Sequence, residues 1–342
     1  MSRSSGEDRS SGASQRDGSS QAGSPQTRQE RAHVRARALA PAKINLGLFV
    51  GPVRESDGRH ELASVMQSIS LADELTLEPA PTGATGEEII CPGVPDDPAE
   101  NLAAAALQTF RDATGWDAGP LRLSIDKRIP VAAGLGGGSA DAAAALRLAQ
   151  YASGLGSDEL LLELGARLGA DVPAQIAPGR WLATGAGERL HELMAPSHPF
   201  GVLVLPVAAE LSTADVYARA EEIGAQCTAQ ELADAARRLE RALQLGAGAP
   251  DERELLHNDL QAAAIALCPQ IEPALTQALD CGADAAFLSG SGPTVVGLFL
   301  RANGPGRAQR AVAGLSGREP APICATPVDA AYALAGSMSD SA

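Results

Sequence analysis

Four glycines within five positions, Gly134, Gly136, Gly137 and Gly138, form the segment of this sequence best suited to chemistry. Because glycine has no Cβ atom, the backbone N–H groups of such a loop can approach an anion closely. Ser139 follows and can cap a helix whose positive N-terminal end would face the same anion. The segment therefore predicts a phosphate-binding loop, and the plainer alternative is a flexible turn before an Ala-rich helix.

Two better-known phosphate loops do not fit this segment. A Walker A loop requires Gly-Lys followed by Ser or Thr, and no lysine follows these glycines. A dinucleotide-binding loop requires the pattern G-x-G-x-x-G, and Ser139 stands in the place of the third glycine. It also requires a ribose-binding acid after a second strand, whereas Asp158 and Glu159 begin a predicted helix. These differences argue against a dinucleotide-dependent oxidoreductase.

Three other segments contain residues that can act on an anion. Lys43 lies in an apolar run, where its ammonium group is costly unless it meets an anion or a carboxylate or reaches solvent at a strand edge. Asp171 lies between apolar residues after a predicted helix end, where it can act as a base or close a turn. Ser289–Thr294 is either a β-turn or a second group of N–H donors. Taken singly, none of the three decides the function.

The composition narrows the class of protein. A formal net charge of −15 over 342 residues disfavours binding to nucleic acid and to anionic membranes. The five cysteines include no C-x-x-C pair, which is typical of a reducing compartment, and no apolar run approaches the ~20 residues of a membrane span. We therefore expect a cytoplasmic protein without a nucleic-acid or membrane partner. The oligomeric state is not predicted.

Strand and helix patterns alternate along the chain after residue 33. Strands are expected at Val34–Ala40, Ile44–Val50, Ser64–Leu77, Leu121–Ile125, Val202–Val207, Ala285–Ser289 and Val295–Leu300. Helices are expected at Asn101–Thr114, Ser139–Ala152, Ser157–Leu168, Thr228–Leu245 and Glu252–Leu267. Pro41 predicts a bend between the first two strands, and Asp73-Glu74 an interruption of the third. The mixture indicates an α+β protein with a domain break around residues 192–201.

The order of the motifs resembles one superfamily. P-A-K-I-N near the start, P-x-x-x-G-L-G-G-G-S-A in the middle and S-G-S-G-P-T near the end are similar to the three motifs of the galactokinase, homoserine kinase, mevalonate kinase and phosphomevalonate kinase (GHMP) superfamily. Within it, the sequence most resembles the 4-diphosphocytidyl-2-C-methyl-D-erythritol kinases of the non-mevalonate isoprenoid pathway, over about residues 35–330. Further matching runs are Gly136–Asp141, Gly169–Pro173, Asn101-Leu102, Gly185–Glu188, Ser212-Thr213 with Tyr217, and Asn258–Leu260.

The resemblance implies a two-domain GHMP kinase fold. An N-terminal α/β domain over residues 34–195 would carry the phosphate loop, and a ferredoxin-like C-terminal domain would span residues 196–330. Residues 1–33 are rich in Ser, Gly, Gln and Arg, and this composition predicts a disordered tail, with a transit peptide as the alternative. A second tail is expected over residues 331–342. The implied reaction is transfer of a phosphoryl group from ATP, with Mg²⁺, to the 2-hydroxyl of a substrate that carries a cytidine diphosphate group.

By motif position, the resemblance makes Lys43 and Asp171 the catalytic pair. Asp171 would accept the proton of the substrate hydroxyl, and Lys43 would keep Asp171 ionised. The Mg²⁺ ligands are not assigned. The implied ATP-binding residues are Pro130, Val131, Ala132, Ala133, Gly134, Leu135, Gly136, Gly137, Gly138, Ser139 and Ala140.

The implied substrate-binding residues are Asn45, Arg59, His60 and Tyr217. Here the sequence departs from the family, which usually has D-G-Y-H where this chain has Asp57-Gly58-Arg59-His60. The Arg59 guanidinium can stack on cytosine in place of the ring, or it can point to solvent. The alternatives left open are another kinase of the superfamily, of the homoserine or mevalonate type, and a non-catalytic ligand-binding relative.

Overall fold

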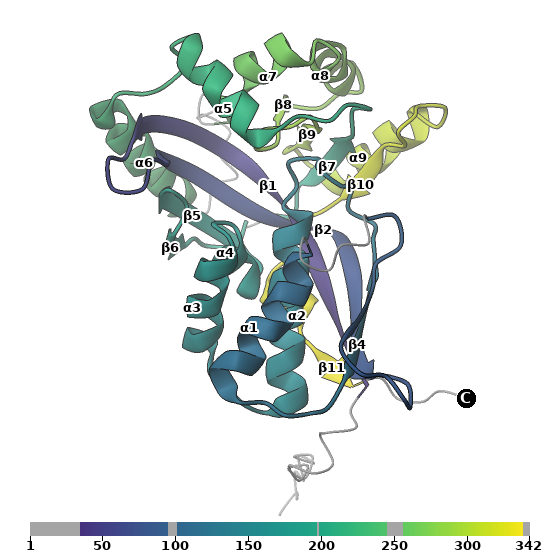
Figure 1. Ribbon diagram of the computed structural model, residues 1–342. Helices are drawn as coiled ribbons and strands as arrows, with labels where there is room; N and C mark the ends of the chain where they lie inside the picture. The colour runs from purple at the N-terminus through teal and green to yellow at the C-terminus, as the bar shows by residue number, and fades with distance from the viewer. Residues whose placement is uncertain (1–34, 95–100, 197, 245–255, 338–342) are drawn as a thin grey trace, which may run out of the picture.

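The computed structural model describes residues 35–94, 101–196, 198–244 and 256–337, which form two sheets and the helices that cover them (Figure 1). The strands are β1 (Ala36–Val53), β2 (His60–Pro79), β3 (Glu88–Ile90), β4 (Leu121–Asp126), β5 (Arg180–Gly185), β6 (Arg189–Glu192), β7 (Gly201–Leu205), β8 (Ala285–Leu288), β9 (Val295–Phe299), β10 (Ile323–Ala325) and β11 (Gly336–Ser337). The helices are α1 (Leu102–Thr114), α2 (Gly137–Ser153), α3 (Asp158–Leu168), α4 (Val172–Ile176), α5 (Thr213–Glu222), α6 (Ala229–Gln244), α7 (Gln261–Leu267), α8 (Ile271–Asp280), α9 (Gly304–Gly314) and the 3₁₀ helix η4 (Ala330–Ala333).

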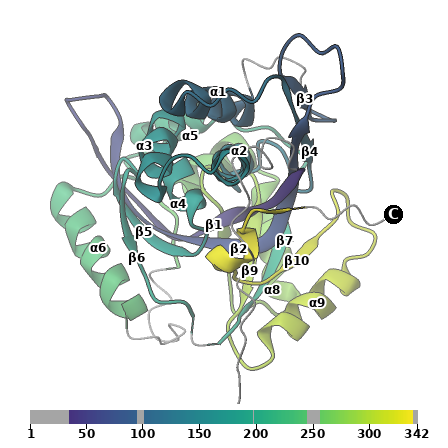
Figure 2. The same ribbon diagram turned by 90° about the horizontal axis from the view of Figure 1, so that it is seen from below.

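The long antiparallel pair β1–β2 forms the centre of the larger, seven-stranded sheet. Its two ends take different partners, because β5 pairs with the first part of β2 and β4 with the last part. Helices α1, α2 and α3 lie on one face of this pair, and α6 and the smaller sheet lie on the other (Figure 2).

The separate first and second strands expected from Pro41 are one strand, so that prediction is wrong. Proline cannot donate to the ladder, and the register between β1 and β2 shifts between Pro41 and Lys43 instead of breaking the strand. The backbone N–H of Lys43 donates to the Leu135 carbonyl oxygen at 2.9 Å, outside the ladder. This irregularity ties the catalytic candidate on β1 to the glycine-rich loop.

The interruption expected at Asp73-Glu74 is also absent, because β2 runs through both residues. Asp73 is fully buried within the strand, and its carboxylate accepts hydrogen bonds from the backbone N–H groups of Arg128 and Ile129 and from the Lys127 side chain. A buried acid with this many donors does not end a strand.

Helix α2 is buried on nearly all sides, as its run of alanines permits. It begins at Gly137, with Gly136 as the N-cap residue at φ +69°, so Ser139 lies inside the first turn. The expectation that Ser139 caps this helix is therefore wrong. The helices expected at 101–114 and 157–168 are confirmed, with Asn101 and Ser157 as N-caps.

The smaller sheet has the strand order β10-β7-β9-β8, and all its pairs are antiparallel. In chain order this is a β-α-β-β-α-β unit with strand order 4-1-3-2, which confirms the ferredoxin-like fold. Its inner face shares a core with β1 and β2, through Val202, Val204 and Val296 against Ile44 and Val65. The α+β class is thereby confirmed.

Two expected segments differ at their ends. In the described part of 252–267, helix starts only at Gln261, because the Asn258 side chain donates to the Leu288 and Gly290 carbonyl oxygens. The described part of the expected tail 331–342 contains β11, which pairs with β1. The tail 1–33 lies outside the described residues. No helix in the described ranges is long and apolar enough to span a membrane.

Candidate active site

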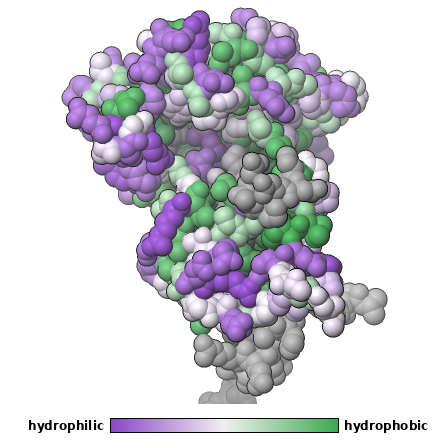
Figure 3. Space-filling model, in the orientation of Figure 1, coloured by the Kyte–Doolittle hydropathy of each residue, from purple (hydrophilic) through white to green (hydrophobic). Residues whose placement is uncertain are grey.

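Two cavities meet at the glycine-rich loop. The larger, of about 700 Å³, lies between the strands β1 and β2 and the helix α5, and the smaller, of about 350 Å³, lies over the start of α2. Three residues line both cavities: Gly134, Gly136 and Ser139. In the space-filling view, hydrophilic and apolar side chains are mixed over the upper part of the molecule, and apolar ones gather near its middle (Figure 3). Two ligands in these cavities would therefore face each other across the loop.

The loop passes so close to its neighbours that two of its glycines admit no side chain. A Cβ atom on Gly136 would lie 2.9 Å from Cγ of Lys43, and one on Gly134 would collide with the Ser289 carbonyl oxygen. The Ser289 hydroxyl also donates to the Gly134 carbonyl oxygen at 3.1 Å. The Ser289–Thr294 segment from the second domain thus contacts the loop directly.

Lys43 and Asp171 form an ion pair at the junction of the cavities. The Lys43 Nζ to Asp171 Oδ2 distance is 3.3 Å, and the side chains are 8% and 37% exposed. Lys43 Nζ donates to Asn45 Oδ1 at 2.8 Å, and Asn45 Nδ2 donates to the Ser64 hydroxyl at 2.7 Å. Lys43 and Asn45 share a strand face because they are two residues apart. Asn45 therefore fixes the position of the Lys43 ammonium group, while the Asp171 carboxylate stays open to the cavity.

Asp171 is positioned by the short helix α4, which starts directly after it. Gln175 on α4 donates to the Pro41 carbonyl oxygen at 3.0 Å. The Arg147 guanidinium donates to the carbonyl oxygens of Gln175 and Ile176 at the end of α4, and to that of Leu39 on β1. These bonds connect the element that carries Asp171 to the strand that carries Lys43.

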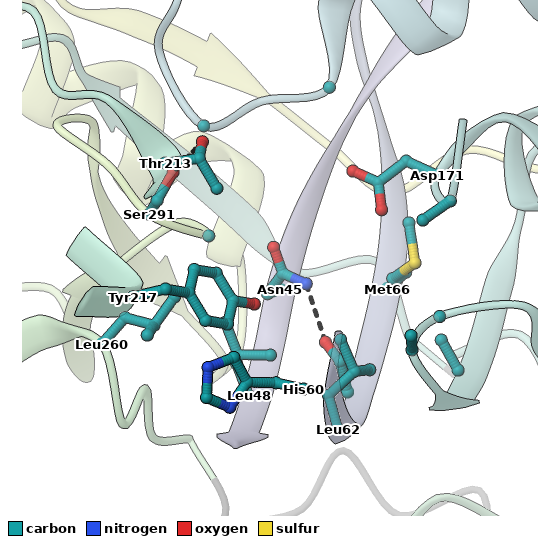
Figure 4. Close-up of a pocket in the computed structure, with 18 of the residues that line it drawn as sticks. Asn45, Leu48, His60, Leu62, Met66, Asp171, Thr213, Tyr217, Leu260 and Ser291 are labelled. Atoms are coloured by element: carbon teal, nitrogen blue, oxygen red, sulfur yellow. Dashed lines mark hydrogen bonds between the residues drawn. The ribbon is translucent and has the colours of Figure 1, made fainter. Parts of the chain in front are cut away.

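The opposite end of the larger cavity has aromatic character. The rings of His60 and Tyr217 lie with centroids 5.2 Å apart and tilted by 34°. His60 Nδ1 lies 3.1 Å from the Gly51 carbonyl oxygen, which can only accept, and a neutral His60 that donates from Nδ1 has Nε2 as an acceptor. Burial raises the pKa of Tyr217 to about 12, so its hydroxyl stays a donor at neutral pH. Figure 4 shows these rings and Asp171 on either side of Asn45.

The smaller cavity contains a buried charge cluster. Lys127 Nζ lies 2.5 Å from Asp73 Oδ2 and 2.6 Å from Asp141 Oδ2. The other oxygen of Asp141 is buried without a hydrogen-bond partner among the described residues. Burial and the neighbouring Asp73 raise the pKa of Asp141 to about 7, although Lys127 opposes the shift. Asn101 lies in the same wall.

Most of the residues predicted from the sequence lie in these walls. The larger cavity is lined by Lys43, Asn45, Arg59, His60, Asp171, Tyr217, Gly134, Gly136 and Ser139. The smaller one is lined by Gly134, Gly136 and Ser139 again and by Pro130, Val131, Ala132, Ala133, Gly137 and Gly138. Leu135 and Ala140 line neither cavity and pack into the two cores, because their side chains point away from the loop surface.

Sequence reasoning missed several residues that shape the site. Ser64 and Gln175 carry no distinctive motif, and Arg147 is an ordinary arginine within an Ala-rich helix. Lys127 had one sequence signal, which is its position shortly before the glycine-rich segment Pro130–Asp141. No group of three or more His, Cys, Asp or Glu side chains that can hold a metal ion is found within the described ranges.

Comparison with known proteins agrees with this geometry. Residues 101–179 match the profile described as GHMP kinases N terminal domain, and residues 231–317 match that of GHMP kinases C terminal. The chain is 40% identical over 292 residues to the 4-diphosphocytidyl-2-C-methyl-D-erythritol kinase of Anaeromyxobacter sp. (strain K), covering 83% of this chain and 86% of the relative.

Solved structures agree as well. A crystal structure of 4-(cytidine 5'-diphospho)-2C-methyl-D-erythritol kinase matches with a TM-score of 0.65 and 34% identity, over 85% of this chain and 98% of that one. Homoserine kinase from Cytophaga hutchinsonii has the same TM-score of 0.65 at 16% identity, over 89% of this chain and 98% of that one, and shows the shared fold. With both domain profiles matched and a relative this similar over most of its length, the chain belongs to the GHMP kinase family.

Proposed function

We propose that this protein is an ATP-dependent kinase that phosphorylates the 2-hydroxyl of 4-diphosphocytidyl-2-C-methyl-D-erythritol, a step of isoprenoid precursor biosynthesis. The observation that carries the proposal is the Lys43–Asp171 pair, 3.3 Å apart, at the point where two cavities meet across a glycine-rich loop. The names of the relatives at 40% and 34% identity support the choice of substrate.

In the proposed reaction, Asp171 accepts the proton of the attacking hydroxyl. It suits this role because its carboxylate is open to the cavity and makes no capping bond to α4. Lys43 orients that carboxylate and offsets negative charge as the phosphoryl group approaches. Phosphoryl transfer depends mostly on positioning and electrostatics, so a fixed ion pair at the junction supplies much of what the chemistry needs.

ATP takes the smaller cavity in this proposal, with its phosphates against the loop and the N-terminal end of α2. The helix start and the loop N–H groups attract anions, and glycine lets the phosphates come close. Mg²⁺ fits the junction because Ser139 and Asp171 offer oxygen atoms, the donors that this ion prefers. When bound, Mg²⁺ would neutralise charge on the phosphates.

The larger cavity takes the diphosphocytidyl sugar alcohol. The cytosine lies beside the Tyr217 ring, where the His60 Nε2 acceptor can take a hydrogen bond from its exocyclic amino group. The reacting end then lies toward Asn45 and Asp171. We place the reaction in the cytoplasm, which the five unpaired cysteines support.

The direct test is a coupled assay of ADP release with purified protein, Mg²⁺ and ATP. We expect turnover with the diphosphocytidyl sugar alcohol and none above background with homoserine or mevalonate. The variant Asp171→Asn should still bind ATP but lose about 10²-fold or more in kcat, as the loss of a general base does. Equal turnover with homoserine would refute the proposed substrate, and unchanged turnover of Asp171→Asn would refute the proposed base.

A further inference from the structure

Arg59 lines the wall of the larger cavity. Its Nη2 donates to the Ala186 carbonyl oxygen at 2.9 Å, in the turn between β5 and β6. The next residue of that turn, Gly187, lies against Ala170, since an added Cβ atom would be 3.4 Å from the Ala170 Cβ. On the other side, Arg59 directly precedes His60 in the chain. Arg59 therefore reaches from the start of the strand that carries His60 to the turn that packs beside Ala170, the residue before Asp171.

A second arginine fixes the turn to which Arg59 is attached. Arg54 Nη1 donates to Glu188 Oε1 at 2.6 Å, and Glu188 Oε2 accepts from the Ala186 N–H at 2.7 Å. Arg54 Nη2 lies 2.5 Å from Asp57 Oδ2 in its own turn. The Arg54 bond lowers the pKa of Asp57, so that carboxylate remains charged and bound to Arg54. The two hairpin tips are thus tied together, and the Ala186 carbonyl oxygen is held in place for Arg59.

This network leaves the Arg59 side chain without an ion pair among the described residues. Of the three acids in these turns, Asp57 and Glu188 are bound by Arg54, and Glu55 forms no ion pair with Arg59. Lys43, the other Lys or Arg in the cavity wall, is paired with Asp171. Among the described residues, no carboxylate pairs with the Arg59 side chain. A guanidinium that lines a cavity and has no ion pair is suited to an anionic ligand, in a chain of net charge −15.

Resting on the proposed function, we infer that Arg59 binds the diphosphate of the substrate and does not replace a stacking ring on cytosine. The diphosphate is the covalent middle of the substrate, joining the cytidine to the sugar alcohol, and Arg59 reaches from the strand that carries His60 to the turn beside Ala170. A guanidinium is also well matched to phosphate oxygens, to which it donates two parallel hydrogen bonds. Arg59 is then a specificity-determining residue for a diphosphate-linked substrate.

The test compares CDP with cytidine, because the two probes differ only in the diphosphate. Binding of each to the full-length protein is measured by calorimetry at fixed ionic strength, for wild type, Arg59→Gln, Arg59→Lys and Arg59→Tyr. Arg167→Gln removes an equal charge from the exposed face of α3 and serves as the matched control.

We expect Arg59→Gln and Arg59→Tyr to weaken CDP binding about tenfold, the loss of one good charge-assisted contact, and to change cytidine binding less than about twofold. Arg59→Lys should recover only part of the CDP affinity lost in Arg59→Gln, because lysine retains the charge but cannot donate two parallel hydrogen bonds. In turnover, Arg59→Gln should raise the substrate KM with little change in kcat, since the diphosphate does not react.

Each of the other outcomes would refute either the inference about Arg59 or the proposed function. Equal weakening of cytidine and CDP in Arg59→Gln, with recovery in Arg59→Tyr, would overturn the inference in favour of base stacking. Unchanged CDP binding in Arg59→Gln would overturn it in favour of other donors, such as the start of α5 with Thr213. If wild type turns over the sugar alcohol in either case, the proposed function stands. If wild type shows no turnover, both the function and the inference fail.

Discussion

Replacing Gly136 by alanine tests how the loop positions Lys43. Gly136 has φ +69°, and an added Cβ atom would lie 2.9 Å from Cγ and 3.1 Å from Cε of Lys43. The left-handed backbone alone should cost alanine about 1–2 kcal/mol of stability. Lys43 must also move, because a carbon–carbon contact at 2.9 Å is too short, and it then leaves its position 3.3 Å from Asp171. A displacement on the order of 1 Å can reduce the rate about 10²-fold.

Gly115 offers a matched control for the backbone cost. It has φ +65° at the end of α1, and an added Cβ atom would meet nothing within 4 Å. Gly115→Ala should therefore lose about 1–2 kcal/mol in urea unfolding and keep the wild-type kcat, whereas Gly136→Ala should lose both stability and kcat.

Steady-state kinetics with varied ATP completes the test of Gly136→Ala. The reasoning is refuted if this variant keeps the wild-type kcat. A change confined to the KM for ATP would also refute it, because the added methyl group would then obstruct the nucleotide and not Lys43.

Three further predictions concern the surroundings of the site. Ala132 has φ +52°, so Ala132→Gly should stabilise the protein by up to about 1 kcal/mol, whereas Ala133→Gly, without a left-handed backbone, should destabilise it. Since burial raises the pKa of Asp141 from 3.8 to about 7, the folded state holds a proton that the unfolded chain loses. The free energy of unfolding should therefore fall as pH rises from about 4 to about 7, and urea titrations of Asp141→Asn should show a flatter fall. Arg147→Met removes three partly buried hydrogen bonds to backbone carbonyls of β1 and α4 and should cost about 2–5 kcal/mol in urea unfolding, whereas the exposed Arg167→Met should change little. An unchanged pH slope in Asp141→Asn, or a wild-type stability of Arg147→Met, would contradict the respective account.

Local chemistry made much of the fold predictable. Asn101 and Ser157 are good helix caps and Gly115 is a good helix end, so α1 and α3 are readable from a few residues each. Elements without such local signals were missed: the β5–β6 hairpin and the short helix α4 depend on contacts with β2 and α2. Pro41 and Asp73 misled for the same reason, since a register shift and a set of distant donors accommodate them within long strands.

The sequence by itself determined which chemistry was available, because glycine spacing, an isolated lysine and an isolated acid are properties of residue type and order. It placed Lys43, the loop and Asp171 in three separate segments and left each with a plain structural alternative. Only the tertiary structure decided that these segments meet, because Lys43 contacts Leu135 and Asp171, residues far away in the chain, and these contacts depend on how α2 and α4 pack with β1. It also decided the surroundings of Arg59, which has no ion pair because Arg54 binds Asp57 and Glu188.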